Sequence, residues 1–186
     1  MSEGEDISDA QLIAAAKSGE RRAFDELVAR HVPRLLILAT RMLSNEADAQ
    51  DAVQNAMASA WLALHRFDEA RSVAPWLTTI TLNKCRDAMR ARRLRNIFGF
   101  EADDRGVTVA DPHPGQDSQM ADRQALALVR EEITRLPSNL KEPFVLVTFD
   151  GRSQAEAAQI LGITEKAVET RIYRARARLK ERFAKS

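Results

Sequence analysis

The chain has 186 residues, of which 45% are hydrophobic and 30% charged, and its 28 basic and 27 acidic side chains leave a net charge of +1. This composition excludes pervasive disorder, while few glycines, one tyrosine and long stretches rich in Ala, Leu, Arg and Glu argue against an all-β fold. A single cysteine, Cys85, excludes an intramolecular disulfide framework, and three widely spaced histidines form no metal-ligand pattern, so we expect neither a metal nor a cofactor.

The chain carries no signal for the membrane. Its N-terminal sequence MSEGEDISD is acidic and lacks the apolar segment of a signal peptide. The longest strictly apolar runs, such as residues 35–39, are too short to span a bilayer. We therefore expect a cytoplasmic protein that does not insert into the membrane.

Hydrophobic periodicity predicts helices throughout the first part of the chain. A capping box opens a short helix over 8–17. Apolar residues at three- and four-residue steps predict a long helix over 24–42, with Pro33 in its interior, and a third helix over 53–64.

A loop is expected over 66–74, and Pro75 then suits the first turn of a fourth helix that runs to about residue 95. Residues 96–122 show no period, hold several glycines and prolines, and read as an extended acidic linker.

Helical pattern resumes over 123–136 and continues over 139–149. A second capping box opens a short helix over 153–160, and a glycine-containing turn leads into a last helix over 164–183. The fold class we expect is all-α, with two helical domains on either side of the linker.

Charge is segregated along the chain although its total is near zero. Residues 71–100 carry seven basic side chains and one acidic one. Residues 101–122 carry one basic and six acidic side chains, and residues 151–186 carry nine basic and four acidic ones. Two basic blocks within helical patterns favour a polyanionic partner, because cations neutralise phosphates and release condensed counterions. A solvated helix face is the alternative for either block alone.

The last two helices form a helix-turn-helix pattern, in which a short capped helix, a tight turn and a longer basic helix follow one another. One stripe of the longer helix is apolar and is expected to face the core: Val168, Ile172, Ala175 and Leu179. The opposite side is then free to enter a major groove of DNA.

Residues near the start of that helix are placed to read bases. Glu169 is suited to accept from a cytosine amino group, and Lys166 or Arg174 to donate to guanine. Other arginines of the helix are better placed for phosphates, which position a protein without reading sequence.

The fourth helix has a basic C-terminal part with Trp76 near its start, a combination suited to single-stranded or distorted nucleic acid. Core packing is the alternative for Trp76 and for Trp61, and we favour it for each.

The third helix has a polar face of carboxylates and amides. A solvated surface is the default interpretation of this face, and acid/base chemistry is a poor alternative because no histidine is nearby. No nucleotide-binding or hydrolase motif is present.

Four stretches together resemble bacterial RNA polymerase sigma factors of the extracytoplasmic-function class. They are DAQLIAAAKSGERRAFDELVARH (9–31), DAQDAVQNAMASAW (48–61), PWLTTITLNKCRDAMRARR (75–93) and residues 136–183. The resemblance implies a sigma region two over 1–95, a linker over 96–122 and a sigma region four over 123–186.

The resemblance also implies a role for each surface. The third helix would dock on the coiled-coil of the largest polymerase subunit, through Asp48, Asp51, Gln54 and Asn55. The loop at 66–75 and the fourth helix would hold and melt the minus-ten element, through Arg71, Trp76, Lys84, Arg86, Arg90 and Arg93. The helix-turn-helix would read the minus-thirty-five element, through Ser153, Lys166, Glu169, Thr170, Arg171, Tyr173, Arg174, Arg176 and Arg178.

The chain departs from the family pattern at Gln50, Asn55 and Met57, where members commonly carry two acidic residues and a phenylalanine. Its docking face is therefore less acidic than is usual.

The function implied is that of a non-enzymatic transcription initiation factor. Its partners would be core RNA polymerase, promoter DNA and an anti-sigma factor, and the free chain would be a monomer. The alternative is a dimeric helix-turn-helix regulator whose N-terminal helices serve dimerisation or sensing; it would bind duplex DNA tightly without polymerase.

Overall fold

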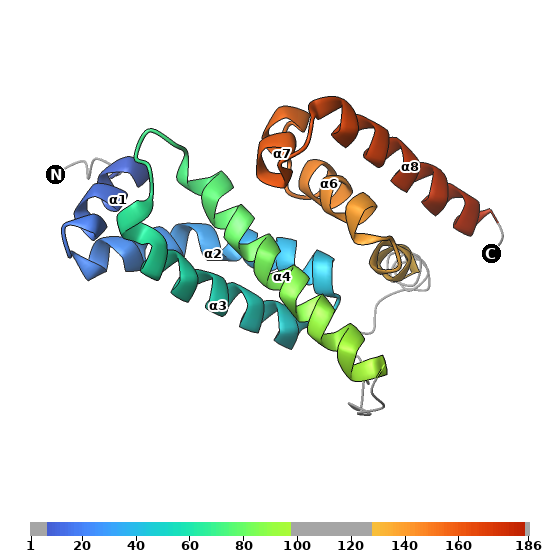
Figure 1. Ribbon diagram of the computed structural model, residues 1–186, viewed down its shortest axis with the longest axis horizontal. Coiled ribbons are helices and arrows are strands. Elements are labelled where there is room, and N and C mark those ends of the chain that lie inside the picture. The colour runs from blue at the N-terminus through green and yellow to red at the C-terminus, as the bar shows by residue number, and fades with distance from the viewer. Residues whose placement is uncertain (1–6, 98–127, 185–186) are drawn as a thin grey trace, which may run out of the picture.

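The computed structural model describes residues 7–97 and 128–184, and every regular element in these two stretches is helical (Figure 1). The all-α expectation is therefore confirmed. The first stretch, called here the N-terminal unit, contains α1 (Asp9–Lys17), α2 (Arg21–Leu43), α3 (Glu46–Ala63) and α4 (Val73–Ile97). A 3-10 turn at Leu64–Arg66 follows α3.

The second stretch, 128–184, is called here the C-terminal unit. Residues 128–134 are helical, and α6 (Ser138–Thr148), α7 (Gln154–Leu161) and α8 (Glu165–Phe183) follow. Figure 1 shows these helices as a group beside α4, with α8 on the side away from the N-terminal unit. Most of the linker expected over 96–122 lies outside the described residues.

Side-chain caps fix where several helices begin, as the sequence predicts. Ser8 and Ser153 each form both hydrogen bonds of a capping box, and Thr164 accepts from the backbone N–H of Ala167 at the start of α8. Each cap satisfies a backbone N–H that has no partner inside its helix. The turn between α7 and α8 needs Gly162, whose φ of +66° is a left-handed conformation that suits glycine.

The fourth helix is longer than predicted. It begins at Val73 rather than Pro75 and ends at Ile97, which confines the preceding loop to 67–72. Pro75 is accommodated because the first N–H groups of a helix lack intrahelical acceptors, so a proline removes no hydrogen bond there.

The N-terminal unit is built around the small inner face of α3. Ala49, Ala52, Ala56 and Ala60 are all buried, and α3 packs on both α2 and α4. Small side chains let the three helices approach closely, and larger buried residues fill the space around them. The largest of these are Ile13, Leu27, Leu38, Met42, Leu77 and Leu82.

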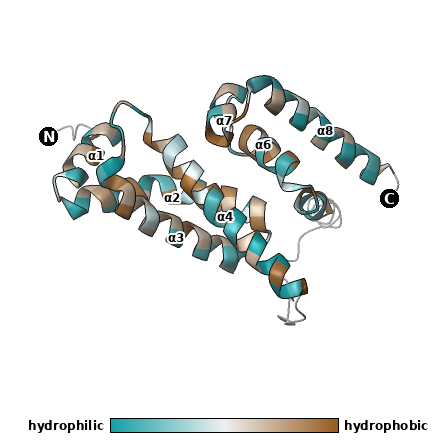
Figure 2. Ribbon diagram, viewed as in Figure 1, coloured by the Kyte–Doolittle hydropathy of each residue, from teal (hydrophilic) through white to brown (hydrophobic). Residues whose placement is uncertain are grey.

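The buried apolar residues of the C-terminal unit belong to the same hydrophobic cluster as those of the N-terminal unit. The predicted inner stripe of α8 is confirmed, since Val168, Ile172 and Ala175 are buried and Leu179 packs against them. Figure 2 shows α8 as mostly hydrophilic, whereas α6 beneath it carries strongly hydrophobic segments. Burial of this narrow stripe is what holds a highly charged helix on the surface.

The two units also pack on each other, α6 against α2 and α7 against α4. None of the helices in the described part is both long and apolar enough to cross a membrane.

Replacing a central core residue should destabilise the fold far more than replacing an exposed one. Leu38 of α2 is 2% exposed and Leu62 of α3 is 74% exposed. We expect Leu38→Ala to lower the free energy of unfolding in urea by about 2–5 kcal/mol, because it removes apolar contacts and leaves a cavity. Leu62→Ala, the control, should change it by less than about 0.5 kcal/mol. Equal effects of the two changes would contradict this packing.

Candidate functional site

The polar face of α3 is accessible and firmly positioned. Asp51, Gln54 and Asn55 are exposed and Asp48 is half-buried. The N-cap Asn45 accepts a hydrogen bond from the backbone N–H of Asp48, which fixes the first turn. Since the opposite side of the helix is buried alanine, these polar side chains must project outward.

A groove of about 360 Å³ runs between α3 and α4. Asp48, Asp51 and Asn55 line one side and Lys84, Asp87 and Arg95 the other, over a floor of Ala52, Ala88 and Ala91. Gln54 is not among the lining residues. The structure therefore places three predicted polymerase-binding residues in the same groove as Lys84, which was predicted to contact DNA. Sequence reasoning missed Asp87 and Arg95, because only the packing of α3 on α4 brings them to this groove.

The cations of α4 do not share one face. At about 100° per residue, Arg86, Arg90 and Arg93 lie within an arc of about 60°, and Lys84 lies on the opposite side. Arg90 and Arg93 are exposed, and Arg90 pairs with Asp87. The structure thus separates the predicted minus-ten residues of this helix into an arginine face and a lysine that points toward α3.

Arg86 is held by the C-terminal unit. Its guanidinium donates two hydrogen bonds to the Glu142 carboxylate, at 2.8 Å and 2.7 Å, and a third to the side chain of Asn83. The hydrogen bond from Glu142 raises the pKa of Arg86 above its ordinary value. A bidentate charge-assisted pair of this kind is among the stronger polar interactions in proteins.

Hydrogen bonds from Lys17, the last residue of α1, hold the loop before α4. Lys17 Nζ donates to the carbonyl of Phe67 at 3.1 Å and to Glu69 at 2.6 Å. Trp76 is half-buried with its ring against Phe67, centroids 4.5 Å apart, and Arg71 is exposed at the end of the loop. The packing of Trp76 agrees with the core alternative.

Trp61 is 40% exposed and stacks edge-on against Phe24, with ring centroids 5.0 Å apart. It therefore lies at the margin of the core rather than in its centre.

The outer face of α8 is open. Glu169, Arg174, Arg176 and Arg178 are exposed, and Tyr173 is 75% exposed. Arg171 and Thr170 are half-buried at the edge of this face. An exposed cationic face on a helix that follows a capped short helix has the shape and charge required to enter a major groove.

Four of the residues predicted to contact the minus-thirty-five element already have partners in the chain. Lys166 pairs with Glu169 at 2.7 Å, the Thr170 hydroxyl donates to the Lys166 carbonyl, and the Ser153 hydroxyl belongs to the capping box with Glu156. The exposed Lys166–Glu169 pair contributes little stability and can exchange for another ligand.

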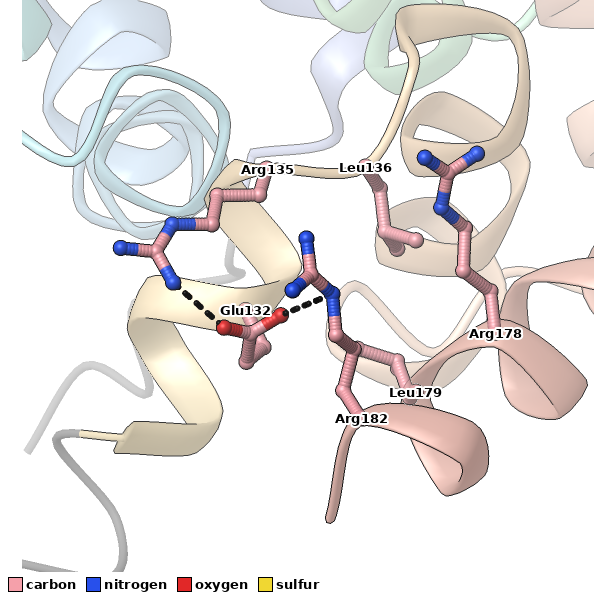
Figure 3. Close-up of a pocket in the computed structure, with 6 residues that line it drawn as sticks. All are labelled: Glu132, Arg135, Leu136, Arg178, Leu179 and Arg182. Carbon is pink, nitrogen blue, oxygen red and sulfur yellow. Dashed lines mark hydrogen bonds and ion pairs between the residues drawn. The ribbon is translucent and has the colours of Figure 1, made fainter. Parts of the chain in front are cut away.

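The far end of α8 is anchored to the helical residues that precede α6 (Figure 3). Glu132 accepts from Arg135 at 2.6 Å and pairs with Arg182 at 3.4 Å. Arg178 and Leu179 line the same small pocket as Glu132. The anchor fixes the direction of α8, and no local pattern in the sequence reveals it.

No cluster of three metal-ligating side chains exists within residues 7–97 and 128–184. Cys85 is fully buried in α4, and its pKa is raised to about 12, mainly by burial and further by the nearby Glu142 carboxylate. A buried thiol with so little thiolate is packed and chemically inert.

Both halves of the chain match known families. Residues 27–95 match Sigma-70 region 2, and residues 126–179 match Sigma-70, region 4. The RNA polymerase sigma factor CnrH of Cupriavidus metallidurans is 44% identical over 177 residues, which is 92% of each chain. The ECF RNA polymerase sigma factor SigM of Mycobacterium tuberculosis is 36% identical over 172 residues, covering 92% of this chain and 83% of that one.

Solved structures agree with the sequence matches. CnrH in complex with the cytosolic domain of CnrY superposes with a TM-score of 0.72 at 37% identity, over 97% of this chain and 99% of that one. The sigma factor RpoE in complex with the anti-sigma factor NepR from Bartonella quintana superposes with a TM-score of 0.63 at 27% identity. The match covers 86% of this chain and 96% of that one.

The buried thiol should be almost unreactive in the folded chain. A pKa of about 12 leaves very little thiolate at pH 8. We expect Cys85 to react with a disulfide reagent such as DTNB at least about a thousandfold more slowly than in the chain unfolded by guanidinium chloride. Labelling of the folded chain at the unfolded rate would contradict this placement.

Proposed function

Because the chain belongs to the sigma-70 family, in its extracytoplasmic-function class, it binds core RNA polymerase and directs it to promoters, and we propose which of its surfaces carry out each step. The observation that carries the proposal is the pair of cationic helices, α4 in the N-terminal unit and α8 in the C-terminal unit. The chain has no catalytic role in this scheme and works in the cytoplasm, where the polymerase is.

The polar face of α3 docks on core polymerase. Asp48, Asp51 and Asn55 line one wall of the α3–α4 groove, and the alanines of its floor leave room for an incoming helix. The other wall carries two cations, Lys84 and Arg95, and one carboxylate, Asp87. The complementary polymerase surface should therefore place cations against α3 and carboxylates against α4, since matched potentials decide orientation and partner choice.

The minus-ten element is held by the loop at 67–72 and the arginine face of α4. The bonds from Lys17 support this loop, so its backbone is ordered before DNA arrives. A preformed pocket matters because extracting a base from its stack costs a few kcal/mol. Arg90 and Arg93 supply cations on the exposed side of α4, while Arg86 first has to leave Glu142.

The minus-thirty-five element is read by α8. Lys166, Glu169 and Arg174 project from its first half, where a recognition helix meets base edges. Arg176 and Arg178 lie further along, where they suit phosphates.

We further propose that an anti-sigma factor regulates this chain. Two solved relatives, CnrH and RpoE, are each described in complex with another protein: the cytosolic domain of CnrY and the anti-sigma factor NepR. The similarity of this chain to both supports a partner of the same kind.

Two measurements test the function as a whole. The chain should elute as a monomer alone and with core polymerase when mixed with it, and the mixture should start transcription at defined promoters. A dimeric regulator would instead bind duplex DNA tightly by itself and ignore the polymerase.

Reversing the charge on α3 should abolish polymerase binding. We expect Asp51→Arg to weaken association with core enzyme at least about tenfold, because it places a cation where a cationic partner surface is expected. Co-purification with core polymerase measures this, and circular dichroism confirms that the chain remains folded. Asp25→Arg, a charge reversal at another exposed aspartate, on α2, is the control and should bind normally. Unchanged co-purification of Asp51→Arg would refute the docking face.

Removing one side chain from α8 should relax promoter choice. We expect Glu169→Ala to reduce discrimination between a native and a scrambled minus-thirty-five element by about tenfold, equivalent to one lost base contact. The readout is the transcript ratio from the two templates, with Glu181→Ala as the control near the end of α8. Core binding should stay unchanged in both variants. If the unmodified chain used both templates equally, the assignment of α8 would fail.

A further inference from the structure

The loop before α4 carries the wrong charge for a segment that holds DNA. Residues 67–72 read FDEARS, with two carboxylates and one guanidinium. A DNA strand attracts cations through its phosphates and repels carboxylates. The two carboxylates must therefore be turned away from the strand or neutralised before this loop can bind it.

The first carboxylate, Asp68, is used inside the loop. It accepts a hydrogen bond from the backbone N–H of Ala70 at 3.0 Å, and the Asp68 carbonyl accepts from the N–H of Arg71 at 3.0 Å. Aspartate commonly closes a turn in this way, by bonding to the backbone two residues further on. Asp68 thus shapes the loop, and its charge is directed at the loop's own backbone.

The second carboxylate, Glu69, is neutralised from outside the loop. Its partner is Lys17, the last residue of α1, whose Nζ lies 2.6 Å from Glu69 Oε1. The Lys17 side chain is 25% exposed and that of Glu69 50% exposed, so water screens the pair only in part. Figure 1 shows α1 and this loop at the same end of the N-terminal unit.

The same ammonium also holds the backbone at the start of the loop. Lys17 Nζ donates to the carbonyl of Phe67 at 3.1 Å. Phe67 is 6% exposed and its ring packs on Trp76, so this carbonyl belongs to a fixed point from which the turn at 68–71 projects. One lysine therefore connects the buried start of the loop to its exposed acidic residue.

A protonated amine suits this position because it has three N–H donors and can serve a carbonyl and a carboxylate at once. Methionine has a similar length but donates no hydrogen bond. In its place the Phe67 carbonyl would lose this donor and the Glu69 carboxylate would be free to turn toward a bound strand.

We propose that Lys17 is a positioning residue for promoter melting, which fixes the loop at 67–72 and masks the negative charge of Glu69 from the DNA. Its ammonium is committed to two acceptors of the loop, so it acts through the loop rather than by contacting DNA. The role of α1 then extends beyond packing on α2. This inference rests on the proposed function of the loop in holding the minus-ten element.

Melting of the minus-ten element tests this role, with 2-aminopurine in the element of a duplex promoter as the fluorescent probe of unstacking. With core polymerase, we expect Lys17→Met to slow melting by about fivefold, because an unmasked carboxylate repels the phosphates. Lys17→Arg keeps a cation with several donors and should melt at nearly the normal rate. Arg21→Met, which removes an exposed cation from the start of α2, is the matched control and should also melt normally.

Neutralising Glu69 separates charge masking from general damage to the fold. Glu69→Gln alone should melt the promoter at close to the normal rate. Combined with Lys17→Met, it should restore melting at least about threefold relative to Lys17→Met alone, which lost stability could not explain. Normal melting by Lys17→Met, or an equal loss in the single and double variants, would overturn the inference.

Hydrogen exchange in the free, full-length chain tests the contacts without polymerase. The backbone N–H groups of Ala70 and Arg71 should exchange at least about threefold faster in Lys17→Met, and those of α8 at an unchanged rate. Unchanged exchange at Ala70 and Arg71 would overturn the positioning role and leave the proposed function intact. An unmodified chain that bound core polymerase but melted no promoter would instead refute the proposed function, and this role with it.

Discussion

The bidentate ion pair between Arg86 and Glu142 is the interaction on which the arrangement of the two helical units depends. Glu142 is only 7% exposed, and a carboxylate in such surroundings requires a fixed cation. The cation that serves it stands on the helix expected to contact promoter DNA. A single guanidinium cannot serve a carboxylate and a phosphate in the same geometry, so one side chain couples the position of the C-terminal unit to the availability of α4.

In both units, a helix with a narrow buried face presents a broad polar surface. α8 buries only a narrow apolar stripe, in which Val168 and Ala175 are fully buried, and most of its exposed residues are charged. The buried face of α3 consists largely of alanines, which let α2 and α4 pack closely against it. This close packing holds the polar face of α3 rigidly. In each case a thin inner face supports a functional outer one, which is how a small helical protein presents several binding surfaces.

Local chemistry explains why much of the fold can be read from the sequence. The capping boxes at Ser8 and Ser153 involve groups three residues apart, and the inner stripe of α8 repeats every three or four residues. The order of four family-like stretches then identifies the class. Where the sequence misplaced the start of α4, the cause was that Pro75 is compatible with more than one position in a first helical turn.

The sequence by itself therefore determined the helices, their caps, the segregation of charge and the family, because each of these depends on residues close together in the chain. Only the tertiary structure decided that Lys84 lines a groove with α3 while Arg86 turns to Glu142, and that Cys85 is fully buried. The partners of Arg86 and Arg34 lie 56 and 116 residues away along the chain. No periodicity or spacing records such pairs, since they exist only once separately formed helices have packed together.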